Sequence, residues 1–157
     1  KIRSNHLWQE MVELPDEPDR YSMYASENLA IKGAHEDGSV PRVRRFTIRK
    51  DGFVSVRAEA KQGELVTKPL FFAGDKLTVN YDAQLGEAGS IRVEILDDKQ
   101  RPIPGYMIKD CAPLSKDEID ATVTWKGGAD VSSLAGKPIH LRFVLNHADL
   151  FSFRFTD

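Results

Sequence analysis

The stretch "IHLRFVLNHADLFSFRF", from Ile139 to Phe155, decides the fold. Apolar side chains occupy every second position in two consecutive runs: Ile139, Leu141, Phe143 and Leu145, then Phe151, Phe153 and Phe155. Because side chains of a β-strand point alternately to its two faces, this spacing predicts two strands that each bury one face. The phenylalanines of the second run are expected in the core, with Ser152 and Arg154 opposite them.

The same alternation recurs upstream, in "ELVTKPLFF" (64–72), "KLTVNYDA" (76–83), "SIRVEIL" (90–96) and "DATVTW" (120–125). Two further runs in "RVRRFTIRKDGFVSVRAEA" (42–60) flank the turn-forming residues Lys50-Asp51-Gly52 and predict a β-hairpin. No stretch repeats apolar residues with the period of a helix. The sequence therefore predicts an all-β fold, an antiparallel β-sandwich of jelly-roll-like character, over residues 41–157.

Residues 1–40 lack this pattern. The acids and prolines of "ELPDEPDR" (13–20) break both helix and strand, so we expect an irregular segment or linker with at most one short strand, at "YSMYAS" (21–26). The length of 157 residues suits one ordinary domain. Because the chain starts at Lys1 and not at Met, we expect a fragment of a larger protein.

Composition argues against several classes of function. A net charge of -2 gives no case for binding nucleic acid, and no apolar run is long enough to cross a membrane. The single cysteine, Cys111, rules out an internal disulfide framework and a multi-cysteine zinc site. No basic group other than Lys109 adjoins Cys111, so a buried plug is expected there and not a nucleophile.

The residues that carry metal or hydrolytic chemistry show no diagnostic spacing. None of the four histidines pairs at a ligand spacing, and His140 is expected to be solvated on the polar face of its strand. No serine-hydrolase motif occurs, and we assign no catalytic residue and no cofactor. A structural calcium ion is a candidate, since oxygen ligands can come from scattered loops. Its candidate ligands are Asp97, Asp98, Asp110 and Asp149, with Asp117 and Asp130 as further choices.

Carbohydrate is the ligand class that the remaining residues suggest. Aromatic rings stack on sugars, and Tyr106, Trp8 and Tyr24 are candidates for that role, whereas Trp125 is expected in the core. Basic residues crowd one arm of the predicted hairpin: Arg42, Arg44, Arg45, Arg49 and Lys50. This basic arm is a candidate because arginine binds carboxylated or sulfated sugars bidentately. The predicted site takes Arg45 and Arg49 from this arm, Arg57 from across the turn, and Asp110. The alternatives for this arm are a solvated outer face of the sandwich and a surface that pairs with a missing domain.

The connection from Leu96 to Ile119, "LDDKQRPIPGYMIKDCAPLSKDEI", is unusually long. Three prolines restrict its backbone, and Gly105 permits a tight turn. We expect a rigid crossover between the two sheets, anchored by Cys111. Its exposed part around Tyr106 and Asp110 is the predicted place for a sugar or an ion.

Several motifs resemble one kind of module: "PIPGY…DC" (102–111), "VTWKG" (123–127) and "LAGKP…LRF" (134–143). The chain is similar to the C-terminal β-sandwich of exported bacterial proteins related to glycoside hydrolases. In those proteins a five-bladed β-propeller of the fructosidase and arabinanase kind comes first. The resemblance implies a β-sandwich, a carbohydrate context and an extracellular or periplasmic location. It implies no catalytic residue here, because the catalytic acids would lie in the propeller.

Three functions remain open at this point. The first is a non-catalytic module that binds a polysaccharide or oligosaccharide for a polysaccharide-degrading enzyme. The second is a structural appendage that packs on a catalytic β-propeller of the same protein and stabilises it. The third, which the sequence favours least, is a stand-alone glycosidase or lyase. No nucleic acid and no membrane is expected as a partner.

Overall fold

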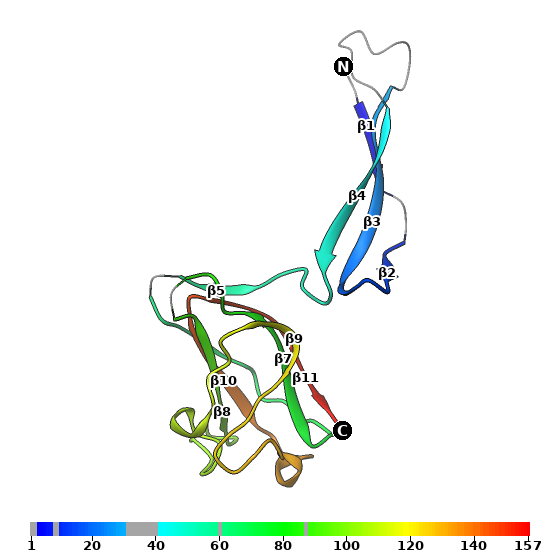
Figure 1. Ribbon diagram of the computed structural model, residues 1–157. Helices are drawn as coiled ribbons and strands as arrows, with labels where there is room; N and C mark the ends of the chain where they lie inside the picture. Colours follow the sequence, from blue (N-terminus) through cyan, green and yellow to red (C-terminus); the bar gives the residue numbers. More distant parts are fainter. Residues whose placement is uncertain (1–2, 8–9, 31–40, 60, 87) are drawn as a thin grey trace. The chain divides into compact units, whose positions relative to one another are not determined.

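The computed structural model describes residues 3–7, 10–30, 41–59, 61–86 and 88–157 (Figure 1). Its strands are all antiparallel, and the helical elements of the described residues are two short 3-10 turns. This confirms the predicted all-β fold. The chain divides into two compact units, residues 1–53 and residues 54–157, so the boundary lies thirteen residues beyond the predicted start of the sandwich at 41.

The first unit is a sheet built around one long strand. It contains β1 (Arg3–Leu7), β2 (Val12–Leu14), β3 (Glu17–Ala30) and β4 (Arg42–Arg49). Strand β4 runs along one edge of β3, and β1 and β2 share the other edge. The prediction of an irregular N-terminal segment is therefore wrong. Its prolines are compatible with strands because Pro15 lies in a turn and Pro18 is the second residue of β3.

The predicted hairpin over residues 42–60 is also wrong. The turn forms at Lys50 and Asp51, as expected, but the described strands β4 and β5 (Val56–Ala58) do not pair with each other. Strand β4 pairs with β3, whereas β5 pairs with β11 (Ala148–Thr156) at the far end of the chain. The turn thus ends one unit and leads into the next.

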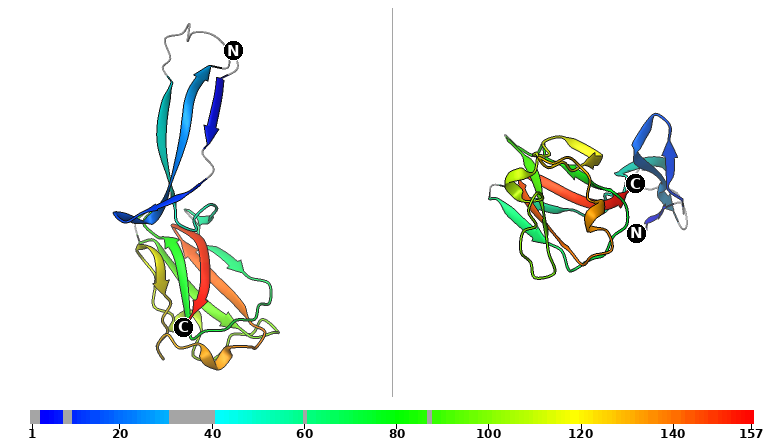
Figure 2. Two further views of the ribbon diagram at one scale, coloured as in Figure 1. Left: turned by 90° about the vertical axis from the view of Figure 1, so that its right-hand side faces the viewer. Right: turned by 90° about the horizontal axis from the view of Figure 1, so that it is seen from below.

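The second unit is a sandwich of two sheets (Figures 1 and 2). One sheet has the order β6-β10-β8, and the other has the order β5-β11-β7-β9. The remaining elements are β6 (Gly63–Val66), β7 (Lys76–Asp82), β8 (Ser90–Leu96), η1 (Ile108–Asp110), β9 (Asp117–Thr122), η2 (Ser132–Leu134) and β10 (His140–Asn146). Consecutive strands lie in alternate sheets, so each connection crosses from one sheet to the other.

The core lies between the two sheets. Its fully buried side chains come from both inner faces: Leu77, Val79, Tyr81, Ile91, Val93, Ile95, Ile139, Leu141, Phe143 and Leu145. The alternation in β8 and β10 is thus confirmed. In β11 an irregularity between Leu150 and Ser152 shifts the register, and only Phe153 and Phe155 of the three predicted phenylalanines pack on this core.

The stretch from Ile139 to Phe155 forms the middle strand of the β6-β10-β8 sheet and an inner strand of the β5-β11-β7-β9 sheet. Strands β10 and β11 are joined by His147 alone, whose φ of 43° lies in the left-handed region. A side chain at Gly89 would lie 2.7 Å from the carbonyl oxygen of His147, so glycine permits this close approach.

Candidate functional site

The long connection after β8 covers the open edge of that strand. Ile91 exchanges two main-chain hydrogen bonds with Leu114, at 2.8 and 2.9 Å. Farther along, the amide of Ile95 donates to the carbonyl of Tyr106 at 3.0 Å, and the carbonyl of Ile95 accepts from the amide of Ile103 at 3.0 Å. An uncovered edge would expose these groups as a template for pairing with another chain. The connection therefore protects the sheet.

Side chains complete this edge at Val93. The Val93 amide donates to Sγ of Cys111 at 3.3 Å, and Nε1 of Trp125 donates to the Val93 carbonyl at 3.0 Å. Both side chains are 5% exposed. Burial raises the pKa of the Cys111 thiol, which disfavours the nucleophilic thiolate. The predictions of a crossover between the sheets, a buried Cys111 anchor and a core position for Trp125 are confirmed.

Tyr106 is a structural residue and not the exposed platform that the sequence suggested. Its ring is half-buried and meets Trp125 edge-on, with 5.3 Å between ring centroids. Its hydroxyl donates to the carbonyl of Asp130 at 2.9 Å. The proline-rich turn before it therefore positions the ring against the core. His140 is likewise buried, with Nδ1 2.8 Å from the Thr67 carbonyl, which corrects the expectation of a solvated ring.

A polar groove of about 460 Å³ lies on the outer face of the β6-β10-β8 sheet. The register places Glu64, Val144 and Arg92 side by side across the three strands. The next rows contribute Arg142 and, on the other side, Asn146 opposite Ser90. The groove is lined by Gln62, Glu64, Ser90, Arg92, Ile108, Arg142, Val144 and Asn146. Ile108 brings the long connection to the edge of this groove.

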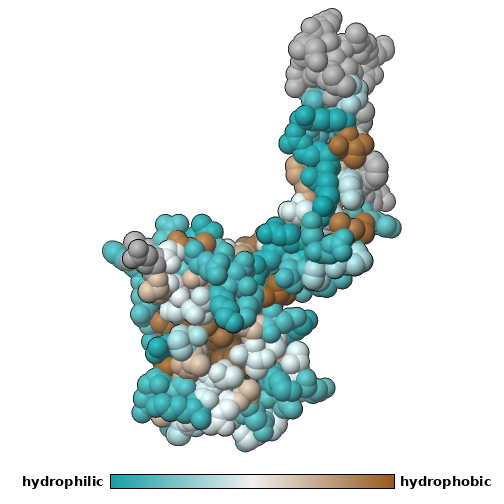
Figure 3. All heavy atoms as spheres, viewed as in Figure 1, coloured by the Kyte–Doolittle hydropathy of each residue, from teal (hydrophilic) through white to brown (hydrophobic). Residues whose placement is uncertain are grey.

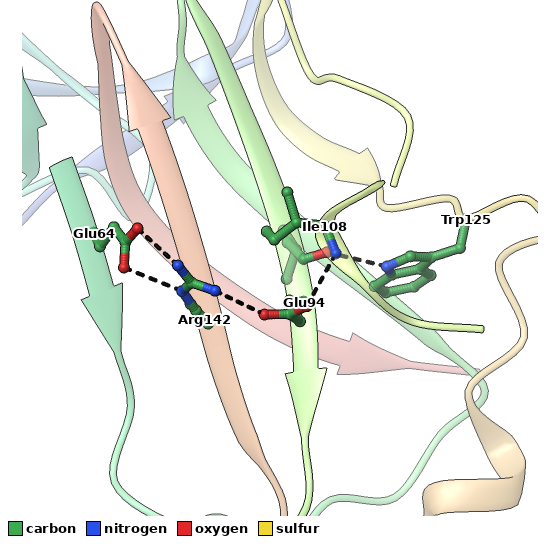
Figure 4. A network of polar contacts seen from close by, with 6 residues as sticks. Glu64, Glu94, Ile108, Trp125 and Arg142 are labelled. Atoms are coloured by element: carbon green, nitrogen blue, oxygen red, sulfur yellow. Dashed lines mark hydrogen bonds and ion pairs between the residues drawn. The ribbon is translucent and has the colours of Figure 1, made fainter. Parts of the chain in front are cut away.

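Arg142 is held between two carboxylates in this groove (Figure 4). Its Nε and Nη2 donate to the two oxygens of Glu64 at 3.1 and 2.7 Å, and Nη1 donates to Glu94 at 3.0 Å. Glu94 is 4% exposed, and its other oxygen accepts the amide of Ile108 at 3.2 Å. The network thus joins three strands to η1 and fixes the guanidinium in one orientation.

The predicted basic arm lies in the first unit and is neutralised there. Arg42 and Arg44 each pair with Glu27, at 2.8 and 3.1 Å. Arg45 pairs with Glu17, and Lys50 pairs with Glu13 at 2.9 Å. These ion pairs favour the alternative of a solvated outer face over a site for acidic sugars.

The structure brings only part of the predicted sugar site together. Tyr24 lies opposite Arg45 in the β3–β4 register, and Arg49 follows on the same side of β4. Arg57 belongs to the second unit, where it pairs with Asp149 at 2.6 Å. The remaining candidates of that unit, Tyr106 and Asp110, lie on the long connection, and Trp8 falls outside the described residues.

Three of the candidate calcium ligands, Asp97, Asp110 and Asp149, are engaged in separate ion pairs. Asp97 binds Arg101 at 2.6 Å, Asp110 binds Lys126 at 3.2 Å, and Asp149 binds Arg57. Asp97 and Asp98 both line a second cavity of about 320 Å³ at one end of the sandwich. Within the described part of the chain, no three acidic, histidine or cysteine side chains gather as a metal site would require. A structural calcium ion is thus untested, and the ion pairs of these carboxylates argue against it.

The alternation of the sequence contained a partial signal for the groove, because Glu64, Arg92 and Arg142 fall on polar faces of predicted strands. It contained no signal for which strands are neighbours.

None of the helical segments in the described residues has the length and apolar character of a membrane span. No protein-family model, no curated protein and no solved structure matches this chain, so its resemblance to glycoside-hydrolase modules stays a prediction.

Proposed function

We propose that this chain is a non-catalytic carbohydrate-binding module of a polysaccharide-degrading enzyme, and that its sugar site is the groove on the β6-β10-β8 sheet. The observation that carries the proposal is the fixed Glu64–Arg142–Glu94 network beneath an open groove. Polar groups that are ordered before binding lose little entropy when a ligand arrives. The extracellular or periplasmic location belongs to the same proposal and rests on the resemblance.

The lining of the groove suits a sugar. A pyranose presents hydroxyl groups around its rim and CH groups on its faces, so it needs polar partners beside an apolar contact. Val144 supplies the apolar contact at the centre, with Glu64 and Arg92 on its two sides. The volume of about 460 Å³ lies within the usual range for small-ligand sites.

The chemistry of the carboxylates favours binding over hydrolysis. A glycosidase needs a general acid whose pKa is raised so that it stays protonated. The hydrogen-bonded Arg142 guanidinium instead holds the pKa of the Glu64 carboxyl below its ordinary value. Glu94 is buried under the connection and bound to the same guanidinium.

Affinity electrophoresis and calorimetry against a panel of neutral, uronic and sulfated glycans test the proposal. We expect at least one glycan to retard the chain, and Val144→Arg, which fills the centre of the groove, to abolish the retardation. The control is Arg154→Gln, which changes a charged side chain of the other sheet, where Arg154 pairs with Asp120. Absence of binding to every glycan would contradict the proposal.

A second candidate is the structural appendage that stabilises a catalytic β-propeller. Its support is the first unit, in which Ser22 and Ala25 are the only buried residues among those whose side chains are described. Apolar side chains reach the surface there: Met11, Val12, Val43, Phe46 and Phe53. Figure 3 shows brown, apolar patches on the visible face of this unit. A sheet normally buries one face against another layer, so this one is suited to packing on a further domain.

Hydrogen exchange of the isolated chain tests the second candidate. If the sheet lacks its packing partner, amides of β3 and β4 exchange much faster than those of β8 and β10. The control strands belong to the sandwich and have a core of their own. Equally slow exchange in both units of a monomeric chain would contradict this candidate.

A further inference from the structure

We infer that the groove selects acidic polysaccharides and that Arg92 binds their anionic group, a uronate carboxylate or a sulfate ester. This inference rests on the proposed function, because it names the class of glycan that the same groove takes. The sequence suggested acidic sugars as well, but it assigned them to the basic arm, whose arginines lie in β4. In the structure the available arginine of the groove is Arg92 of β8.

Arg92 differs from the other arginines of the second unit. Arg57, Arg101, Arg142 and Arg154 each bind a carboxylate, at 2.6 to 3.0 Å. Within the described residues, the side chain of Arg92 makes no hydrogen bond and no ion pair, although it is exposed in the groove. Its donors are therefore available to a ligand.

The groove itself explains why Arg92 has no carboxylate there. Glu64 and Arg92 flank Val144 in one row, which puts their Cα atoms about 10 Å apart across two strand spacings. Both oxygens of Glu64 are bound by Arg142. The Glu64 carboxylate is thus engaged by Arg142 and does not pair with Arg92.

The chemistry of the guanidinium defines the ligand. Its planar fork of donors matches the two oxygens of a carboxylate or sulfate, and such charged bonds are stronger than those to hydroxyl groups. Asn146 and Ser90 form the adjacent row, and the Asn146 amide is fixed by donating to the Ala88 carbonyl at 3.0 Å. These neutral side chains suit the hydroxyl groups beside the anion.

Calorimetry with matched pairs of oligosaccharides tests the inference. Three pairs serve as probes: oligogalacturonate and its methyl ester, oligomannuronate and its carboxyl-reduced form, and chondroitin sulfate oligosaccharide and its desulfated form. The first two pairs report on carboxylates and the third on sulfate. We expect at least one acidic member to bind about tenfold or more tightly than its neutral partner.

Three variants assign this preference to a residue. Arg92→Gln is expected to remove the preference while weak binding of the neutral partner remains, and Arg92→Lys is expected to retain part of it. Arg154→Gln makes the same charge change on the other sheet and is expected to keep the full preference. Circular dichroism checks that each variant is folded, as expected for exposed positions.

The outcomes separate this inference from the proposed function. Equal binding of acidic and neutral partners would overturn the inference and leave the carbohydrate site in place. A preference that survives in Arg92→Gln would also overturn it, because another group would then hold the anion. Absence of binding by every probe would overturn both.

Discussion

The indole Nε1 of Trp125 donates a hydrogen bond to the main-chain carbonyl of Val93, 3.0 Å away, inside the sandwich. Trp125, which follows the long connection in the sequence, thus supplies a hydrogen-bond donor to a carbonyl on the otherwise unpaired edge of β8. Trp125→Phe keeps a ring but leaves this buried carbonyl without its donor. We expect a loss of about 1–3 kcal/mol in the free energy of unfolding, measured by urea denaturation.

Tyr106→Phe is the control for that change, because the Tyr106 hydroxyl bonds to a carbonyl in an exposed loop. Water can replace this bond, so its loss is expected to cost under about 1 kcal/mol. Equal stabilities of Trp125→Phe and the unaltered chain would refute a structural role for the indole donor.

Arg142→Met is expected to destabilise the sandwich strongly. It leaves the buried Glu94 carboxylate with the Ile108 amide but without a positive charge. Removing one partner of a buried ion pair typically costs about 3 kcal/mol or more. Glu64→Gln, at the exposed end of the same network, is expected to have a much smaller effect. Similar midpoints for the two variants in chemical denaturation would contradict the assigned network.

The stability of the chain is expected to depend on Asp97 in acid. The side chain of Arg101 and the main-chain amides of Arg101 and Lys99 lower the pKa of Asp97 to about 2, from an ordinary value of 3.8. A carboxyl with a lower pKa in the folded state stabilises that state above its unfolded pKa. This stabilisation is lost as the pH falls through the folded value.

The difference in unfolding free energy between the unaltered chain and Asp97→Asn should therefore be full at pH 6. It should shrink below about pH 4 and vanish near pH 2. Asp98→Asn removes a charge from the neighbouring position and is the control. A difference that stays constant from pH 6 to pH 2 would show that Asp97 has no depressed pKa.

The Cys111 thiol is expected to resist modification in the folded chain. It is buried, accepts the Val93 amide, and has a raised pKa because of its burial. Reaction with a thiol reagent at pH 8 should require denaturant. An exposed cysteine, made by Ser115→Cys in a Cys111→Ala background, should react at once under native conditions. Equal rates for the two thiols would contradict the anchor.

Calcium is expected to leave the thermal stability unchanged. The ion pairs with Arg57, Arg101 and Lys126 occupy three of the candidate carboxylates, and a bound ion would have to displace them. The midpoint of thermal unfolding, Tm, in calcium should therefore equal that in a chelator. A higher Tm in calcium would identify an ion that binds the folded state.

The sequence predicted the strands of the sandwich that bury one face, and it missed β1, β2 and most of the long strand β3 in the first unit. Period-two alternation in β8 and β10 reflects a real difference between core and surface, so both strands were found. Strand β3 has exposed or half-buried side chains along most of its described length, and its letters show no alternation. Alternation reports burial of one face in the sandwich. In the first unit it is missing from β3 but present in β4, although β4 is mostly exposed.

The groove could not be predicted because strand neighbours in this fold are distant in sequence. Glu64 and Arg142 are separated by 78 residues, yet they share two hydrogen bonds. The hairpin prediction failed for the same reason, since it assumed that adjacent runs pair. The prediction of a solvated His140 failed because alternation shows only which face of the strand a side chain is on. It does not show that Thr67, 73 residues away in sequence, lies against the His140 ring on that face.

The order of strands also sets when the sandwich can assemble during translation. Strand β10 is the shared neighbour of β6 and β8, and β11 is the shared neighbour of β5 and β7. On the ribosome, a nascent chain that ends before His140 holds the flanking strands of both sheets but lacks the strands that join them. Their apolar faces are then expected to stay exposed until β10 and β11 emerge, and such exposed surface makes an incomplete chain prone to aggregation.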